Sequence, residues 1–134
     1  MAIGKKVAED RGIEFQIEID VPMDMPFRGA DISLILGNLL ENAVEAADKA
    51  KQKKYIQFKL KYDKKNLLIV VKNNYRGELI RGKGEVLRTT KSDAVNHGIG
   101  LPSVRRTVEK YQGTMAIDDS MPNCFVVRVV LYGT

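Results

Sequence analysis

The chain has 134 residues, of which 44% are hydrophobic and 29% are charged, a composition typical of one soluble globular domain with its own core. Lysine and arginine exceed aspartate and glutamate by 22 − 17 = 5, but they are scattered and tryptophan is absent, which argues against a nucleic-acid platform and suits a smaller anion such as a nucleotide. The single cysteine excludes an internal disulfide, and no apolar stretch reaches membrane-spanning length.

Hydrophobic periodicity divides the chain into strands, with alternating apolar residues, and helices, whose apolar residues recur every three or four positions. In chain order we predict a strand at Glu14–Ile19, a helix at Ser33–Ala47 capped by Asp31 or Ser33, a hairpin of strands at Tyr55–Tyr62 and Leu67–Val71, a helix at Leu101–Tyr111 ended by Gly113, and strands at Thr114–Asp118 and Cys124–Leu131. This order predicts an α+β fold, a two-layer sandwich whose mixed, mostly antiparallel sheet carries helices on one face.

The segment between the hairpin and the second helix has a different character. Residues 75–100 show no sustained periodicity and contain five glycines. A polar stretch of this length inside a compact domain is expected to be functional, and we interpret it as a flexible lid over a binding site. Residues 13–134 are predicted to form the domain, and residues 1–12 are interpreted as the remnant of a preceding helix or linker.

Two asparagines interrupt the apolar first helix. Asn38 and Asn42 are four residues apart and form, with Glu45, a stripe at the border of the apolar face. Asparagine is a poor helix former, because its amide competes for backbone hydrogen bonds. The amide oxygen of Asn42 is a hard ligand of the kind that magnesium takes together with water and phosphate oxygens. On this pattern alone, a solvated helix edge remains the simpler interpretation.

Two further segments carry possible chemistry. The glycines of His97–Leu101 precede a helix, where backbone N–H groups and the helix N-terminus can bind a phosphate, although two glycines also suit an ordinary turn. Asn73 follows a predicted strand, where its amide can receive the exocyclic amine of an adenine. The Asn73-Asn74 pair is also ordinary turn chemistry.

Together these segments resemble the GHKL superfamily of ATP-binding domains, which includes DNA gyrase, the ninety-kilodalton heat-shock chaperone, sensor histidine kinases and mismatch-repair MutL. In histidine kinases of this family, Asn38–Ala43 resembles the N box, Asn73–Gly77 the first glycine box, and Gly98–Leu101 the second. Details such as Glu45 and Thr89-Thr90-Lys91 look like the branch of peptide quorum-sensor kinases, with citrate-sensor kinases as near relatives. The resemblance covers nearly the whole chain.

The resemblance implies the Mg-ATP-binding catalytic domain of a two-component sensor histidine kinase, which transfers the γ-phosphoryl group of ATP to a histidine on a separate dimerisation domain and serves a response regulator. It implies a monomeric, cytoplasmic fragment of a membrane-bound receptor. Asn42 would bind magnesium, and Asn38 would support the catalytic site with it. The residues implied to bind the nucleotide are Asn42, Asn73, Gly77, Lys91, Gly98, Gly100 and Leu101.

The chain departs from the common family pattern at the first glycine box, at Asn38 and at Glu45, where many kinases have a lysine. Asn73 and Tyr75 replace the aspartate and first glycine of the usual Asp-x-Gly-x-Gly turn, so we expect weaker nucleotide binding without the carboxylate. Asn38 stands where hydrolytic members have a glutamate base, which favours transfer over hydrolysis. His97 is the only histidine and is expected to shape the loop, so the phosphate acceptor lies outside this chain.

Three other functions remain open from the sequence. One is a serine kinase of the anti-sigma-factor type, which shares the fold. Another is a degenerate module that has lost ATP binding and acts through protein contacts, for which the altered first glycine box argues. A basic nucleic-acid binder is the third, and it would show salt-sensitive affinity for DNA.

Overall fold

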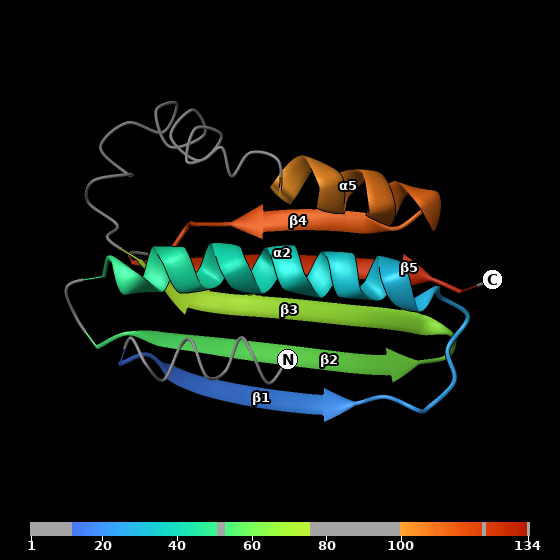
Figure 1. Cartoon of the computed structure of the whole chain (residues 1–134), viewed down its shortest axis with the longest axis horizontal. Helices are drawn as coiled ribbons and strands as arrows, with labels where there is room; N and C mark the ends of the chain where they lie inside the picture. The colour runs from blue at the N-terminus through green and yellow to red at the C-terminus, as the bar shows by residue number, and fades with distance from the viewer. Residues whose placement is uncertain (1–11, 51–52, 76–99, 122, 134) are drawn as a thin grey trace.

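The computed structural model describes residues 12–50, 53–75, 100–121 and 123–133. Two helices and five strands follow one another in these ranges (Figure 1). They are β1 (Glu14–Asp20), α2 (Gly29–Asp48), β2 (Tyr55–Asp63), β3 (Asn66–Asn74), α5 (Gly100–Lys110), β4 (Thr114–Asp118) and β5 (Cys124–Tyr132). The predicted lid falls almost entirely in residues 76–99, outside the described residues.

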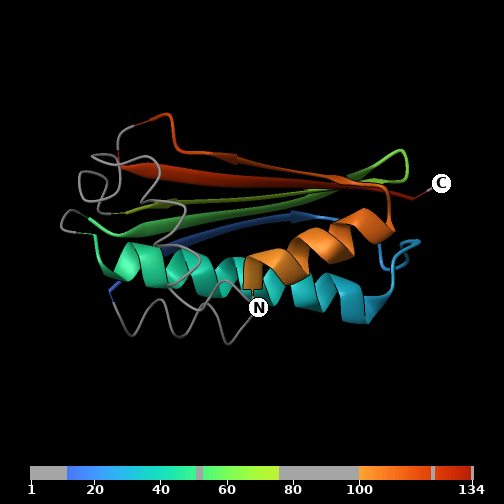
Figure 2. The ribbon, with the colours of Figure 1, turned by 90° about the horizontal axis from the view of Figure 1, so that it is seen from above.

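The five strands form one sheet in the order β1-β2-β3-β5-β4. β1 pairs with β2 in parallel, and the other neighbours are antiparallel. Both described helices lie on the same face of this sheet, as the view from above shows (Figure 2). The predicted two-layer α+β fold with a mixed, mostly antiparallel sheet is therefore confirmed.

The core lies between the helices and the central strands. Strand residues on the helix-bearing face alternate with outward residues, as the period of two requires. The largest fully buried side chains of this core are Phe58, Ile35, Leu39, Ile56, Leu67, Ile69, Leu131, Val71, Val104, Val108 and Val129. Cys124 is also buried in β5, and its Sγ accepts a hydrogen bond from the Tyr55 hydroxyl at 3.8 Å.

Two predicted boundaries were wrong for reasons of tertiary structure. α2 begins at Gly29, with Arg28 as N-cap and no side-chain cap, so neither Asp31 nor Ser33 caps it. β3 continues to Asn74 instead of ending at Val71, because Asn73 and Asn74 pair with the first residues of β5. The Asn73-Asn74 pair is therefore strand and not turn.

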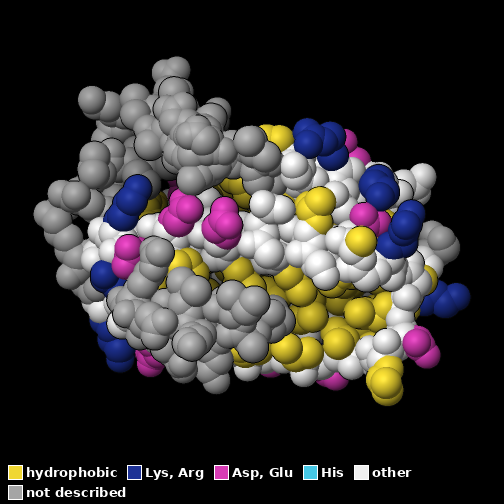
Figure 3. Space-filling view, in the orientation of Figure 1, with side chains coloured by type: hydrophobic (Ala, Val, Ile, Leu, Met, Phe, Trp, Pro, Cys, Tyr) yellow, Lys and Arg dark blue, Asp and Glu magenta, His cyan; other side chains and the backbone are white. Residues whose placement is uncertain are grey.

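β1 is more exposed than its alternation predicts. Its apolar residues share the helix-bearing face, since Ile17 and Ile19 pair with Phe58 and Leu60 of β2. Ile17 is nevertheless 38% exposed and Ile19 51% exposed, and Met23 in the following loop is fully exposed. Figure 3 shows hydrophobic side chains gathered at the surface below α2, on the side of β1.

Candidate functional site

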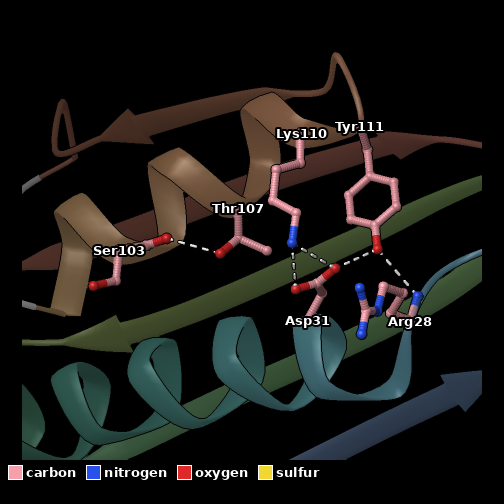
Figure 4. A network of polar contacts seen from close by, with 6 residues as sticks. All are labelled: Arg28, Asp31, Ser103, Thr107, Lys110 and Tyr111. Atoms are coloured by element: carbon pink, nitrogen blue, oxygen red, sulfur yellow. Dashed lines mark hydrogen bonds and ion pairs between the residues drawn. The ribbon is translucent and has the colours of Figure 1, made fainter.

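A cluster of polar contacts joins the first turn of α2 to the end of α5 (Figure 4). The carboxylate of Asp31 accepts hydrogen bonds from the Lys110 amine at 3.0 and 3.2 Å and from the Tyr111 hydroxyl. The backbone N–H of Arg28 donates to the same hydroxyl at 3.0 Å. We call Asp31, Lys110 and Tyr111 the helix clasp, because they tie the start of one helix to the end of the other.

The helix clasp changes the titration of its members. Hydrogen bonds from Tyr111 and Lys110 lower the pKa of Asp31, because both stabilise the charged carboxylate. Burial and the hydrogen bond to Asp31 raise the pKa of Tyr111, because both disfavour the phenolate. The clasp is therefore an anionic carboxylate held by two donors at neutral pH.

The clasp fixes where α5 begins relative to α2. Gly100 lies ten residues before Lys110, which corresponds to about 15 Å along a helix axis. Since the two helices pack together and run in opposite directions, the same length along α2 from Asp31 reaches the region of Asn38 to Asn42. Figures 1 and 2 agree that α5 starts over the middle of α2. The N-terminus of α5 thus lies level with the part of α2 that carries Asn38 and Asn42.

The asparagine stripe lies where the sequence predicts, at the border of the core. Asn38, Asn42 and Glu45 are all partly exposed, while Leu39 and Ala43 between them are buried. The Nδ2 group of Asn38 donates to the carbonyl of Leu34 at 2.8 Å, one turn back in the same helix. This bond orients the Asn38 amide along α2.

The end of β3 brings a third group of polar residues to the same side of the molecule. Asn73 is 1% exposed and Tyr75 is 3% exposed. Asn74 turns to the other face, where its Oδ1 accepts from the Tyr55 N–H at 2.9 Å and its Nδ2 donates to the Lys53 carbonyl. The C-terminal end of β3 lies beneath the second half of α2 (Figure 1).

Three segments that are far apart in the sequence therefore belong to one side of the molecule, where the helices cover the sheet. These are the Asn38–Asn42 stripe, the first turn of α5 with Gly100 and Leu101, and the end of β3 with Asn73. A helix N-terminus attracts an anion, because its first N–H groups are unpaired within the helix. Of the other predicted site residues, Gly77, Lys91, His97 and Gly98 lie outside the described residues.

The donor set suits a magnesium ion shared with a nucleotide better than a metal held by the protein alone. No group of three or more His, Cys, Asp and Glu side chains gathers in the described ranges. Magnesium commonly takes one or two protein oxygens and completes its shell with water and phosphate. The partly exposed amide of Asn42 is an oxygen ligand of this kind, so the residues present fit the ion.

Sequence reasoning missed two features of this region. Asp31 was expected to cap α2, and its contact with α5 gave no local signal, since Lys110 and Tyr111 are about eighty residues away. Tyr75 was considered only as a replacement for a glycine of the turn, whereas it is buried against Phe125 with ring centroids 6.0 Å apart. The available clue was the spacing. Tyr75 follows Asn73 by two residues, and side chains two apart in a strand lie on the same face.

Comparison with known proteins gives the class. The family model described as the GHKL domain matches residues 27–132. This match spans most of the chain, so the protein belongs to the GHKL family. No curated protein matches it in sequence.

Solved structures show the same fold. The catalytic domain of histidine kinase ThkA, in a nucleotide-free form, superposes with a TM-score of 0.75 at 18% identity, covering 99% of this chain and 86% of that one. The mycobacterial sensor histidine kinase MprB gives 0.65 at 20% identity, covering 95% and 87%. The histidine kinase domain of the blue-light-activated kinase EL346 from Erythrobacter litoralis gives 0.67 at 18% identity, covering 97% and 57%. Within the described residues, no helix is long and apolar enough to cross a membrane.

Proposed function

We propose that this chain is the Mg-ATP-binding catalytic domain of a two-component sensor histidine kinase. It would transfer the γ-phosphoryl group of ATP to a histidine on a separate dimerisation domain of the same receptor, from which a response regulator would be phosphorylated. The chain would act on the cytoplasmic side of the membrane. Its membership of the GHKL family and its fold likeness to histidine kinase catalytic domains support this proposal.

The observation that supports the proposal is the start of α5 over the middle of α2. The helix clasp ties Lys110, at the end of α5, to Asp31 in the first turn of α2. Gly100, at the start of α5, is about 15 Å from Lys110 along the helix axis, level with the middle of α2, the part that contains Asn38 and Asn42. A phosphate at the α5 N-terminus would thereby lie near a metal held by Asn42. Phosphoryl transfer depends chiefly on such positioning and charge neutralisation.

Each site residue has a role in this proposal. Asn42 would ligate magnesium, which neutralises phosphate charge when bound. Asn38 would orient the site, and as an amide it would not activate water as a base, which favours transfer over hydrolysis. Asn73 would face the base at the end of β3. The remaining residues proposed to bind nucleotide, through the first glycine box, the lid and the α5 N-terminus, are Gly77, Lys91, Gly98, Gly100 and Leu101.

Calorimetric titration with Mg-ATP tests nucleotide binding. We expect the wild-type chain to bind and Asn42→Ala to lose at least about tenfold in affinity, since an interaction of about 1.4 kcal/mol is a factor of ten. Asn66→Ala is the matched control, because Asn66 is an exposed asparagine at the opposite end of β3 from Asn73. No heat at millimolar nucleotide with the wild-type chain would contradict the proposal and favour the degenerate module.

Phosphoryl transfer from labelled ATP tests the reaction. The chain is mixed with a histidine-bearing helical hairpin in one reaction and with a serine-bearing anti-sigma antagonist in another. We expect acid-labile label on the hairpin, because a phosphoramidate hydrolyses in acid while a phosphoserine ester resists it. Acid-stable label on the serine partner alone would instead assign the chain to the anti-sigma-factor type.

A further inference from the structure

Among the residues that the structure describes, the Tyr75 hydroxyl finds no hydrogen-bond partner although it is buried. Tyr75 is 3% exposed, and its hydroxyl is the one buried side-chain nitrogen or oxygen in the described part of the chain that makes no hydrogen bond. Its ring packs edge-on against Phe125, at 6.0 Å between centroids. Phenylalanine would make the same ring contact without the hydroxyl. A buried hydroxyl that makes no hydrogen bond costs stability.

Tyr75 lies on the same face of the sheet as Asn73. The Tyr75 N–H donates to the Asn123 carbonyl at 3.3 Å, which continues the pairing of Asn73 with Phe125 and Asn74 with Cys124 by one residue. Residues two apart in a strand share a face. The edge-on contact between Tyr75 and Phe125 agrees with this, because Phe125 is the partner of Asn73.

The two side chains present complementary hydrogen-bonding groups. The Nδ2 of Asn73 already donates to the Asn74 carbonyl at 3.0 Å, so its amide oxygen is the group that remains to accept from a ligand. The Tyr75 hydroxyl can donate a proton. An acceptor and a donor on one face match the edge of adenine, which offers an amine at C6 and an acceptor at N1. Guanine offers the reverse, a carbonyl at C6 and a donor at N1.

We propose that Tyr75 is a specificity-determining residue for the nucleotide base, whose hydroxyl donates to N1 of adenine while the Asn73 oxygen accepts from the C6 amine. This inference rests on the proposed function, since it requires that the chain bind a nucleotide at the end of β3. Tyr75 occupies a position that is glycine in the usual first glycine box, and glycine has no side chain to contact the base. A site built to hydrogen-bond one edge rejects a base that leaves its buried groups unpaired.

The test compares Tyr75→Phe with wild type by calorimetry and by urea unfolding. We expect Tyr75→Phe to bind Mg-ATP about 5- to 20-fold more weakly, as for one lost hydrogen bond in a buried site. We expect its stability without nucleotide to be equal or higher, because the unpaired hydroxyl is gone. Tyr132→Phe is the matched control, since Tyr132 is 39% exposed at the far end of β5.

A ligand change provides a second measurement that needs no variant. ATP in which N1 is replaced by C–H should bind the wild-type chain more weakly by the same factor. Tyr75→Phe should lose no further affinity with this analogue, because the substitution and the analogue remove the same hydrogen bond. Wild type should prefer Mg-ATP to Mg-GTP, and Tyr75→Phe should narrow that preference.

The outcomes separate this inference from the proposed function. Equal Mg-ATP affinity of wild type and Tyr75→Phe would overturn the role of Tyr75 and leave nucleotide binding intact. Lower stability of Tyr75→Phe with unchanged affinity would also overturn it, by showing that the hydroxyl has a structural partner. Absence of any nucleotide binding by wild type would remove both proposals.

Discussion

Gly113 provides the sharpest prediction of the packing, because a single methyl group would collide with backbone. Gly113 connects α5 to β4, and its N–H donates to the Val108 carbonyl at 3.0 Å. A Cβ at this position would lie 2.2 Å from the Val130 carbonyl oxygen, against an ordinary contact of 3.4 Å, an overlap of 3.4 − 2.2 = 1.2 Å. It would also lie 3.1 Å from Cγ1 of Val108. The closest neighbour is Val130 backbone, which β5 pairing holds in place, so this clash is not relieved by a side-chain rotation.

We therefore expect Gly113→Ala to destabilise the fold by about 3 kcal/mol, at the upper end of the cost of overpacking. Gly37→Ala is the matched control, since a Cβ at Gly37 meets nothing within 4 Å and Gly37 is exposed inside α2. Alanine is better than glycine in a helix interior by about 0.8 to 1.0 kcal/mol, so this variant should be more stable than wild type. A glycine-to-alanine substitution is thus expected to lower stability at position 113 and to raise it at position 37.

Urea unfolding followed by far-ultraviolet circular dichroism measures both variants, because the chain has no tryptophan to report by fluorescence. We expect the two midpoints to lie on opposite sides of the wild-type midpoint, with similar slopes. A Gly113→Ala protein as stable as wild type would refute the reasoning. It would mean that α5 and β5 are not packed as closely as the structure places them.

Three further predictions concern titratable groups. The fold lowers the pKa of Asp31 from 3.8, so its contribution to stability is present above that value and is lost as pH falls through the folded pKa. Asp31→Asn should therefore lose less stability than wild type as the pH is lowered. An unchanged dependence of the urea midpoint on acid pH would argue against the clasp. The fold raises the pKa of Tyr111 from 10.0, so its contribution to stability is present below pH 10.0 and is lost as pH rises through the folded pKa. Tyr111→Phe should therefore lose less stability than wild type at alkaline pH, which urea midpoints across that range would measure. Cys124 is buried, so a thiol reagent should modify it only at urea concentrations where the dichroism changes, and rapid modification of the folded chain would show that β5 opens locally.

The elements and their order were readable from the sequence, because they depend on local periodicity. The alternation in Tyr55–Tyr62 and the helical spacing in Ser33–Ala47 identified β2 and α2 without any knowledge of their partners. The position of the asparagine stripe at the core border followed from the same spacing, and the structure confirms it for Asn38 and Asn42. Family motifs then indicated an ATP-binding fold, although the roles of individual residues stay predictions.

Pairing between distant segments was decided only by the tertiary structure. β3 extends through Asn73 and Asn74 because β5 supplies their hydrogen-bonding partners, which no local pattern shows. The parallel pairing of β1 with β2 likewise joins segments about forty residues apart.

The candidate site depends most on such long-range contacts. The carboxylate of Asp31, which by sequence suits a helix cap, binds Lys110 and Tyr111 and so sets the start of α5 over Asn38 and Asn42. The burial of the Tyr75 hydroxyl depends on Phe125 of β5. Sequence alone determined which residue types reach the site, because spacing places them on faces of helices and strands. Their partners were decided by the packing of α2, α5, β3 and β5, because burial and hydrogen bonding depend on neighbours that are distant in the chain.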